Sequence, residues 1–158
     1  MNIRRQDGLT TVEFAIIGAA MFVVLFGVIE ISRAMFVLNV LGESTRRAAR
    51  IAAVCPVTDG APREVALFNA PGQGTVSRFI RGLTPGHLAI EYLDANGNVI
   101  ANPTLNFNQI LFVRARVVGF QHQMLIPFAS YLFNTPSFST TLRRESLGVP
   151  RDGVIQPC

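Results

Sequence analysis

The chain has 158 residues and a formal net charge of +4, and 49% of its residues are hydrophobic, with a mean hydropathy of +0.37. This hydrophobic content exceeds what a small soluble domain usually carries, and the length suits one modest domain plus an anchor. All 14 basic residues are arginines, scattered along the chain with acidic residues beside their clusters, as is typical of solvated surface. We therefore expect no nucleic-acid partner.

A long apolar stretch near the N-terminus predicts a helix that crosses a membrane. Over residues 9–29 the only charged residue is Glu13. As an α-helix this stretch would be roughly 30 Å long, which matches the hydrocarbon core of a bilayer. No cleavage site of the ordinary secretory type follows it, so the segment is expected to stay in the protein. We assign residues 9–30 to the span.

Two arginines ahead of the span predict its orientation. Arg4 and Arg5 lie in the short N-terminal stretch formed by residues 1–8. Because positive residues favour the cytoplasmic side of a membrane, we expect the N-terminus in the cytoplasm and the chain beyond Glu30 on the other side. The larger part of the protein is then extracytoplasmic.

The helix is expected to continue past the membrane as an amphipathic segment, residues 31–55. No proline occurs between the span and Pro56, so one unbroken helix is predicted as far as about Val54. Apolar and small residues recur at helical spacing on one side, at Ile31, Met35, Leu38, Leu41, Thr45, Ala48 and Ala52. The opposite side carries Glu30, Arg33, Glu43, Arg47 and Arg50. The apolar stripe needs a partner, which is the protein's own domain, a neighbouring copy or another helix.

Beyond the helix, residues 56–158 are predicted to form a domain of short elements. Its first part contains a loop at 56–62, a segment ambiguous between helix and strand at 63–68, a turn at 69–75 and a short helical piece at 76–82. Its second part contains strands at 88–92 and 99–101 joined by a hairpin turn at 94–98, a longer strand at 110–120, a turn of helix at 124–133 beginning at Pro127, and a strand at 138–145. A polar tail follows Gly148.

Alternation within the strands shows which face is apolar. In the longer strand one face carries Leu111, Val113, Ala115 and Val117, and the other carries Arg114 and Arg116. In the last strand one side carries Phe138, Thr140 and Leu142. Three or four antiparallel strands and one long helix predict an α+β fold, in which the helix lies on the apolar face of a small sheet.

The two cysteines are expected to pair. Cys55 follows the long helix and Cys158 ends the chain, and an even number of cysteines in an extracytoplasmic domain favours a disulfide. Such a bridge would close a loop of about 100 residues, for which the chain-entropy model gives on the order of 4–5 kcal/mol. The alternative is two unrelated thiols, one buried and one on a frayed tail.

The residue pattern argues against an enzyme. His87 and His122 lie at the start and the end of predicted strands, with no Cys, Asp or Glu at ligand spacing. Both are therefore expected to be solvated, and no metal site is predicted. The sequence contains no nucleophile elbow and no Cys–His signature, and its acidic residues are dispersed. We expect no catalytic residues and no cofactor.

The N-terminal residues resemble a known family. Gly8 followed by LTTVEF is similar to the processing site of type IV prepilins. More closely, the pattern from Gly8 to Val54 resembles the TadE-like minor pilins, or pseudopilins, of the tight adherence pilus. The residues that carry this likeness are Glu13, Phe14, Ala15, Gly27, Glu30, Arg33, Ala48, Ala49 and Arg50.

The resemblance implies a pilin-like fold and a processed N-terminus. A prepilin peptidase is expected to cut on the cytoplasmic side between Gly8 and Leu9, which removes residues 1–8 as a leader. The mature protein would then be a single-pass protein of the inner membrane with a periplasmic domain, and would pass into the extracellular pilus if it is incorporated there. Expected partners are the prepilin peptidase, other major and minor pilins, the pilus assembly platform of the inner membrane and membrane lipid.

The resemblance also implies a role for the acid inside the span. Glu13 would pair with the N-terminal amine of a neighbouring subunit as the subunits leave the bilayer, and Phe14 follows it at the helix contact. Ala15 and Ala19 are four residues apart and would let helices approach closely around this pair. Many family members carry proline at the position of Ala19, so the helix is expected to be straighter here.

A second hypothesis from another class also fits the residues. The chain would then be an uncleaved, signal-anchored periplasmic module that binds or senses a ligand. Glu13 would be an acid tolerated near the cytoplasmic surface of the membrane. The two hypotheses differ in whether the mature protein loses Met1 to Gly8.

Overall fold

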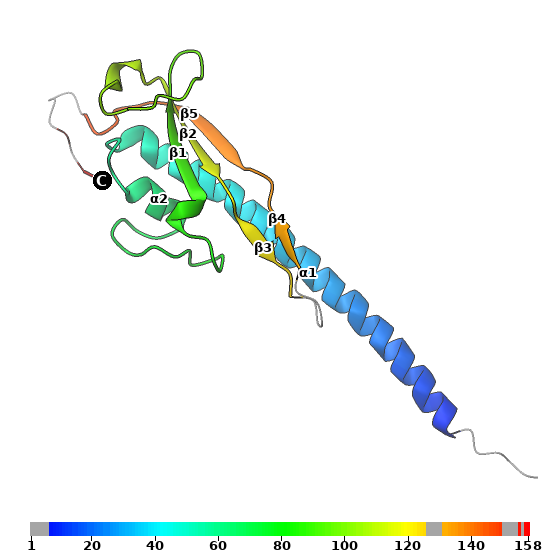
Figure 1. Ribbon diagram of the computed structural model, residues 1–158. Helices are drawn as coiled ribbons and strands as arrows, with labels where there is room; N and C mark the ends of the chain where they lie inside the picture. Colours follow the sequence, from blue (N-terminus) through cyan, green and yellow to red (C-terminus); the bar gives the residue numbers. More distant parts are fainter. Residues whose placement is uncertain (1–6, 126–130, 150–154, 156) are drawn as a thin grey trace, which may run out of the picture.

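The computed structural model describes residues 7–125, 131–149, 155 and 157–158. Its dominant element is α1 (Asp7–Val54), a continuous helix of 48 residues. Figure 1 shows that the N-terminal half of α1 extends away from the rest of the molecule, and that the other elements gather around its C-terminal half. The unbroken helix follows from the absence of proline, the strongest helix breaker, between Asp7 and Val54.

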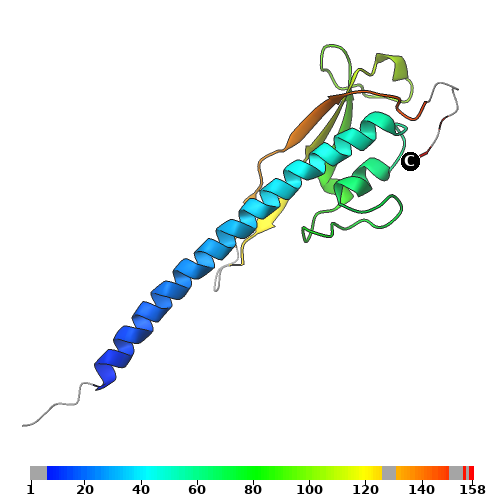
Figure 2. The same ribbon diagram turned by 180° about the vertical axis from the view of Figure 1, so that it is seen from behind.

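A three-stranded antiparallel sheet packs on the C-terminal half of α1. Its strands are β1 (Leu88–Leu93), β2 (Phe112–Val117) and β5 (Ser139–Arg143), in the order β1-β2-β5. Figure 2 shows the sheet on one side of α1. The predicted α+β fold, with a long helix on the apolar face of a small sheet, is confirmed.

The alternation expected in β2 produces the core. Val113, Ala115 and Val117 are buried between the sheet and α1, whereas Arg114 and Arg116 lie on the outer face. On the helix side the same core takes Leu41, Ala48 and other buried residues of the amphipathic segment. The hydrophobic effect therefore fixes both the face of the sheet and the face of the helix.

The other short elements complete the domain. A short helix, α2 (Ala61–Ala66), resolves the ambiguity at 63–68, and the hydroxyl of Ser44 in α1 donates a hydrogen bond of 2.7 Å to the carbonyl of Ala66. Two single turns of 3₁₀ helix, η1 (Pro85–His87) and η2 (Phe107–Gln109), precede β1 and β2. Figure 1 shows α2 beside the C-terminal end of α1.

The short helix predicted at residues 76–82 is wrong, because the segment forms an irregular loop. The side-chain amide of Asn69 donates hydrogen bonds to the carbonyls of Gly74 and Val76, at 3.1 and 3.0 Å. Ile80 and Leu83 are buried and anchor the loop on the core. Hydrogen bonds from the Asn69 side chain satisfy backbone carbonyls that a helical turn would otherwise use. The two buried side chains then hold the segment in place as a loop.

The hairpin predicted around residues 94–98 is only partly correct. The turn is present, and the carboxylate of Asp94 accepts hydrogen bonds from the backbone N–H groups of Asn98 and Asn96. The hydrogen bond from the backbone of Asn98 contributes most to holding the pKa of the Asp94 carboxyl below its usual value, and that from Asn96 adds to it. The returning segment, however, makes only an isolated bridge between Leu93 and Val99. The true partner of β1 is β2, which pairs with it along all six residues and buries an apolar face.

A second, two-stranded sheet lies beside α1, closer to the N-terminus of the helix than the first sheet (Figure 1). Strands β3 (Gln121–Gln123) and β4 (Leu132–Asn134) pair antiparallel, and Figure 1 places them beside α1 at the edge of the domain nearest the extended half of the helix. A turn of helix was expected at 124–133; its start at Pro127 lies outside the described residues. At its other end, Leu132 and Phe133 belong to β4 because they pair with β3, so that part of the prediction is wrong.

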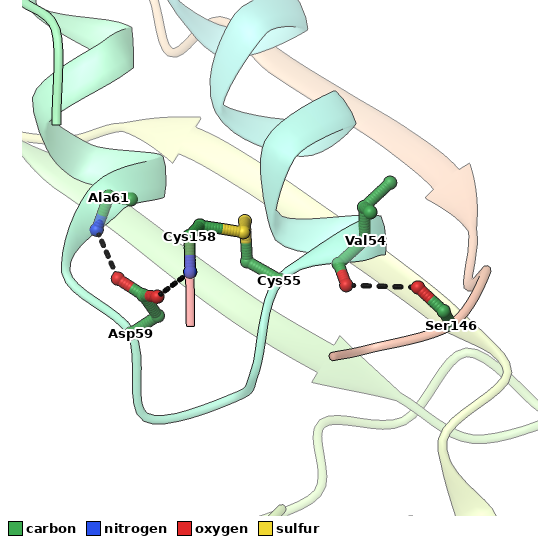
Figure 3. Close-up of a disulfide and its surroundings, with 6 residues drawn as sticks. All are labelled: Val54, Cys55, Asp59, Ala61, Ser146 and Cys158. Carbon is green, nitrogen blue, oxygen red and sulfur yellow. Dashed lines mark hydrogen bonds between the residues drawn. A yellow bond between two sulfur atoms is a disulfide. The ribbon is translucent and has the colours of Figure 1, made fainter. Parts of the chain in front are cut away.

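The disulfide between Cys55 and Cys158 is confirmed. It joins the residue after α1 to the C-terminus across a sequence separation of 103, with the two Cα atoms 5.8 Å apart (Figure 3). A loop of this length corresponds to a stabilisation on the order of 4–5 kcal/mol in the chain-entropy model. The alternative of two unrelated thiols is wrong.

Hydrogen bonds around the disulfide close the chain onto the end of α1. The carboxylate of Asp59 accepts bonds from the backbone N–H groups of Ala61 and Cys158, at 2.8 and 2.9 Å (Figure 3). The hydroxyl of Ser146 donates to the carbonyl oxygen of Val54 at 3.1 Å. This carbonyl has no partner within the helix, so residues late in the chain cap α1.

An ion-pair cluster lies on the outer face of the sheet. Glu91 in β1 pairs with Arg114 and Arg116 in β2, and the Nε–H of Arg114 donates to its carboxylate at 2.7 Å. Burial raises the pKa of Glu91, but the hydrogen bonds and charges of the two arginines outweigh this effect and hold the pKa below its usual value of 4.5. The cluster thus ties β1 to β2 on the face away from α1.

This cluster predicts a loss of stability in acid. Since the pKa of Glu91 is lowered in the folded state, its contribution is fully present above pH 4.5 and is lost as the pH falls through the folded-state pKa. We expect the thermal unfolding midpoint to fall in this acid range, and to fall less in Glu91→Gln. Circular dichroism of both full-length proteins in detergent micelles measures the difference. Parallel pH profiles for the two proteins would contradict the assignment.

Candidate functional site

The first candidate site is the extended N-terminal half of α1. α1 is the one helix among the described residues that is long and apolar enough to cross a membrane, and its most apolar 18-residue window has a mean hydropathy of 2.5. Over residues 9–29 every side-chain position except Gly18 is exposed. So large an exposed apolar surface is not stable in water and requires lipid or other apolar helices around it.

The predicted assembly residues all lie on this extended part. α1 begins at Asp7, so Gly8 and Leu9 stand in its first turn. Glu13 is exposed between apolar neighbours, and the next residue, Phe14, is 78% exposed. Among the described residues, no ion pair to Glu13 occurs within the chain. A partner for this carboxylate must therefore come from outside the part of the protein that the structure describes.

Two small residues lie exposed on the extended half of α1. Ala15 and Ala19 stand about one turn apart and both are exposed. Among the described residues, the domain first covers α1 at Glu30, well beyond both alanines. The two alanines are thus accessible to another helix.

The second candidate site lies where α1 enters the domain. Glu30 is 6% exposed and its carboxylate accepts a hydrogen bond from Arg33 at 2.7 Å. Its other oxygen lies 3.6 Å from Nε2 of His122 in β3, and His122 is 5% exposed. The ring of His122 contacts Phe133 of β4 edge to face, with centroids 5.5 Å apart. We call Glu30, Arg33 and His122 the entry cluster.

The entry cluster corrects two predictions. His122 was expected to be solvated, and Glu30 was expected on the polar side of the helix opposite the apolar stripe; both expectations are wrong. The reason is tertiary, since the β3–β4 pair lies along α1 and covers Glu30. Ile31 and Met35, the first two members of the predicted apolar stripe, are correspondingly turned outward and are 66% and 56% exposed.

The rest of the predicted stripe meets the protein's own domain. Leu41, Thr45, Ala48 and Ala52 are buried, as expected, and the hydroxyl of Thr45 lies 2.9 Å from that of Thr140 in β5. The partner of this part of the stripe is therefore the domain itself. No local signal in the sequence links Glu30 to His122, because an isolated histidine between two glutamines shows no preference for a partner so far along the chain.

His87, the other histidine, has a structural role. Its Nδ1 accepts a hydrogen bond from the backbone N–H of Thr84 at 3.1 Å and completes the capping of η1. Its ring contacts Phe120 edge to face. His87 is half-buried, so the expectation of a solvated side chain is wrong here too. Within the described ranges, no group of three or more His, Cys, Asp or Glu residues is placed to hold a metal ion.

Most of α1 matches a known protein family. Residues 8–50 match the family model described as TadE-like protein. This segment of the chain is similar to the TadE-like family. The match begins at Gly8 and contains both the extended half of α1 and Glu30 and Arg33 of the entry cluster, which confirms the resemblance inferred from the sequence.

The TadE-like match ends within α1 and does not extend to the sheet domain. Comparisons with curated proteins and with solved structures gave no match. Function in the domain must therefore be argued from its own residues.

The entry cluster predicts a measurable difference between buried and exposed acids on the same helix. We expect Glu30→Ala to lower the free energy of unfolding by about 1–3 kcal/mol, because Arg33 loses its charged acceptor and the buried His122 loses the carboxylate 3.6 Å away. The control is Glu43→Ala, which removes an exposed pair with Arg47 and is expected to cost less than about 1 kcal/mol. Urea unfolding of full-length protein in micelles measures both, and equal losses would count against the cluster.

Proposed function

We propose that the protein is a minor pilin, or pseudopilin, of a tight adherence pilus. It would be a structural subunit without catalytic activity that helps to start or assemble the fibre. The observation that carries the proposal is the extended half of α1, an exposed apolar helix with a single acid at Glu13, in a segment that is TadE-like from residue 8 onward.

The energetics of Glu13 support a role in assembly. A carboxylate at the centre of a bilayer costs about 2.5–3.5 kcal/mol on insertion scales, and less near the interface, where Glu13 would lie. A positive N-terminal amine on the neighbouring subunit would offset this cost, because charges attract more strongly where water is scarce. Such a pair forms only at one stagger between helices, so it would set the register of the bundle.

The helix surface beside Glu13 supports close packing. In lipid, helices associate by van der Waals contact, and small residues bring their backbones together. Ala15 and Ala19 provide such a surface within two turns of Glu13, and Phe14 provides a large exposed ring next to it. Other major and minor pilins are the partners that carry matching apolar helices.

The proposed life cycle follows from the order of segments along the chain. α1 would be inserted in the inner membrane with its N-terminus in the cytoplasm and the disulfide-closed domain in the periplasm. A prepilin peptidase would cut between Gly8 and Leu9 and create the positive amine that the assembly contact needs. The assembly platform would then move the subunit out of the bilayer.

Processing after Gly8 is the first test. Intact-mass spectrometry of the protein expressed with a prepilin peptidase should show the loss of Met1 to Gly8, and no loss without the peptidase. Gly8→Ala should block the cut. The matched control is Gly18→Ala, since an added Cβ at Gly18 meets no other atom within 4 Å. Retention of Met1 in the presence of the peptidase would favour the uncleaved, signal-anchored module instead.

The role of Glu13 is the second test. Glu13→Gln keeps the size of the side chain and removes its charge, so insertion and cleavage should be normal while pilus assembly falls. Glu43→Gln, which removes an acid from the same helix outside the span, should leave assembly unchanged. Membrane fractionation, intact mass and pilus yield separate the three steps. Normal pili from Glu13→Gln would show that the proposed pairing is not needed.

A further inference from the structure

A cavity beside the entry cluster is not used by the proposed assembly contact. It has a volume of about 670 Å³ and lies between α1, β3 and the loop that precedes η1. Polar and aromatic side chains from all three line it, including Arg33, Phe36, Arg81, His87, Phe120 and His122. We call it the α1–β3 cavity.

The described lining of the α1–β3 cavity contains two arginines, Arg33 and Arg81, and no acidic residue. The charge of Arg33 is paired with buried Glu30, which accepts a hydrogen bond from it, so the net positive charge of the lining comes from Arg81. Arg81 is exposed on the loop, so its guanidinium is accessible to a ligand. Arginines at a concave site favour a phosphate or carboxylate, to which they donate paired hydrogen bonds.

The rim of the cavity is apolar. Phe36, Phe79, Leu125 and Leu132 line it and are 51%, 57%, 64% and 63% exposed. Leu125 follows β3 and Leu132 is the first residue of β4. These two strands lie at the edge of the domain nearest the extended half of α1 (Figure 1). A small hydrophilic anion would gain nothing from these side chains, whereas an amphiphile would cover them.

The position of the cavity along α1 indicates which kind of amphiphile can reach it. Arg33 is four residues beyond Ile29, the last residue of the apolar stretch, which corresponds to about 6 Å along the helix. The polar headgroup region extends roughly 5–8 Å beyond each face of the hydrocarbon core. If α1 spans the bilayer as proposed above, the guanidinium of Arg33 and the mouth of the cavity therefore stand at the level of the lipid phosphates.

We propose that the α1–β3 cavity binds the headgroup of an anionic glycerophospholipid from the leaflet that faces the domain. The phosphate lies between Arg33 and Arg81, and the acyl chains leave the cavity over Leu125 and Leu132 into the bilayer. Net positive charge selects an anionic headgroup over a zwitterionic one. The inference rests on the membrane orientation given in the proposed function, and it adds a lipid site that holds the domain against the membrane before assembly.

Native mass spectrometry of the full-length protein in detergent micelles tests the proposal. The probes are dioleoyl phosphatidylglycerol, dioleoyl phosphatidylcholine and inorganic phosphate. We expect one phosphatidylglycerol to be retained per chain, with an affinity about tenfold above that of phosphatidylcholine, and about a tenfold loss in Arg81→Gln. Arg143→Gln, which removes an exposed arginine of β5 outside the cavity, is the matched control and should bind as the wild type does.

Three results would overturn the lipid site. The first is equal binding of the two lipids, and the second is an equal loss in Arg81→Gln and Arg143→Gln, which would indicate general attraction to charge. The third is complete displacement of phosphatidylglycerol by inorganic phosphate, which would indicate a free anion as ligand. The same spectra give the intact mass of the chain, so a failure of leader processing is recorded separately from a failure of lipid binding.

Discussion

The structure depends on one constraint, which is that the apolar N-terminal half of α1 has no cover of its own. Its side chains are exposed over about half of a helix that the described part of the domain contacts only from Glu30 onward. Such a surface must be placed in lipid or in a bundle of similar helices. The free energy of the Glu13 carboxylate depends on its surroundings. It is unfavourable in lipid alone and favourable beside a positive partner.

The entry cluster lies where α1 passes from its exposed N-terminal half into the domain. Glu30 is the first buried residue of the helix, and it is held by Arg33 from its own turn and approached by His122 from β3. A buried acid with a basic neighbour on each side is sensitive to the loss of any member, so it fixes where the β3–β4 pair sits on the helix. The α1–β3 cavity, which Arg33 and His122 help to line, lies at this same level.

At the other end of α1 the domain is closed by covalent and polar ties. The disulfide from Cys55 to Cys158 and the hydrogen bond from Ser146 to Val54 join the end of the chain to the end of the helix. Inside this closure the sheet takes one face of α1, with Leu41 and Ala48 buried against it. The domain is thereby attached to the helix as one body.

The sequence by itself determined the features that repeat locally. The length of α1, the inward face of β2 and the apolar span with its one acid all follow from the period of side chains along a helix or a strand, and the cysteines could be paired because there were only two. Only the tertiary structure decided the burial of Glu30 beneath His122, strand β4 in place of a helical turn, and the loop at 76–82. These depend on contacts between residues far apart in the chain, where burial and hydrogen bonding outweigh local propensity, and no periodic pattern encodes such contacts.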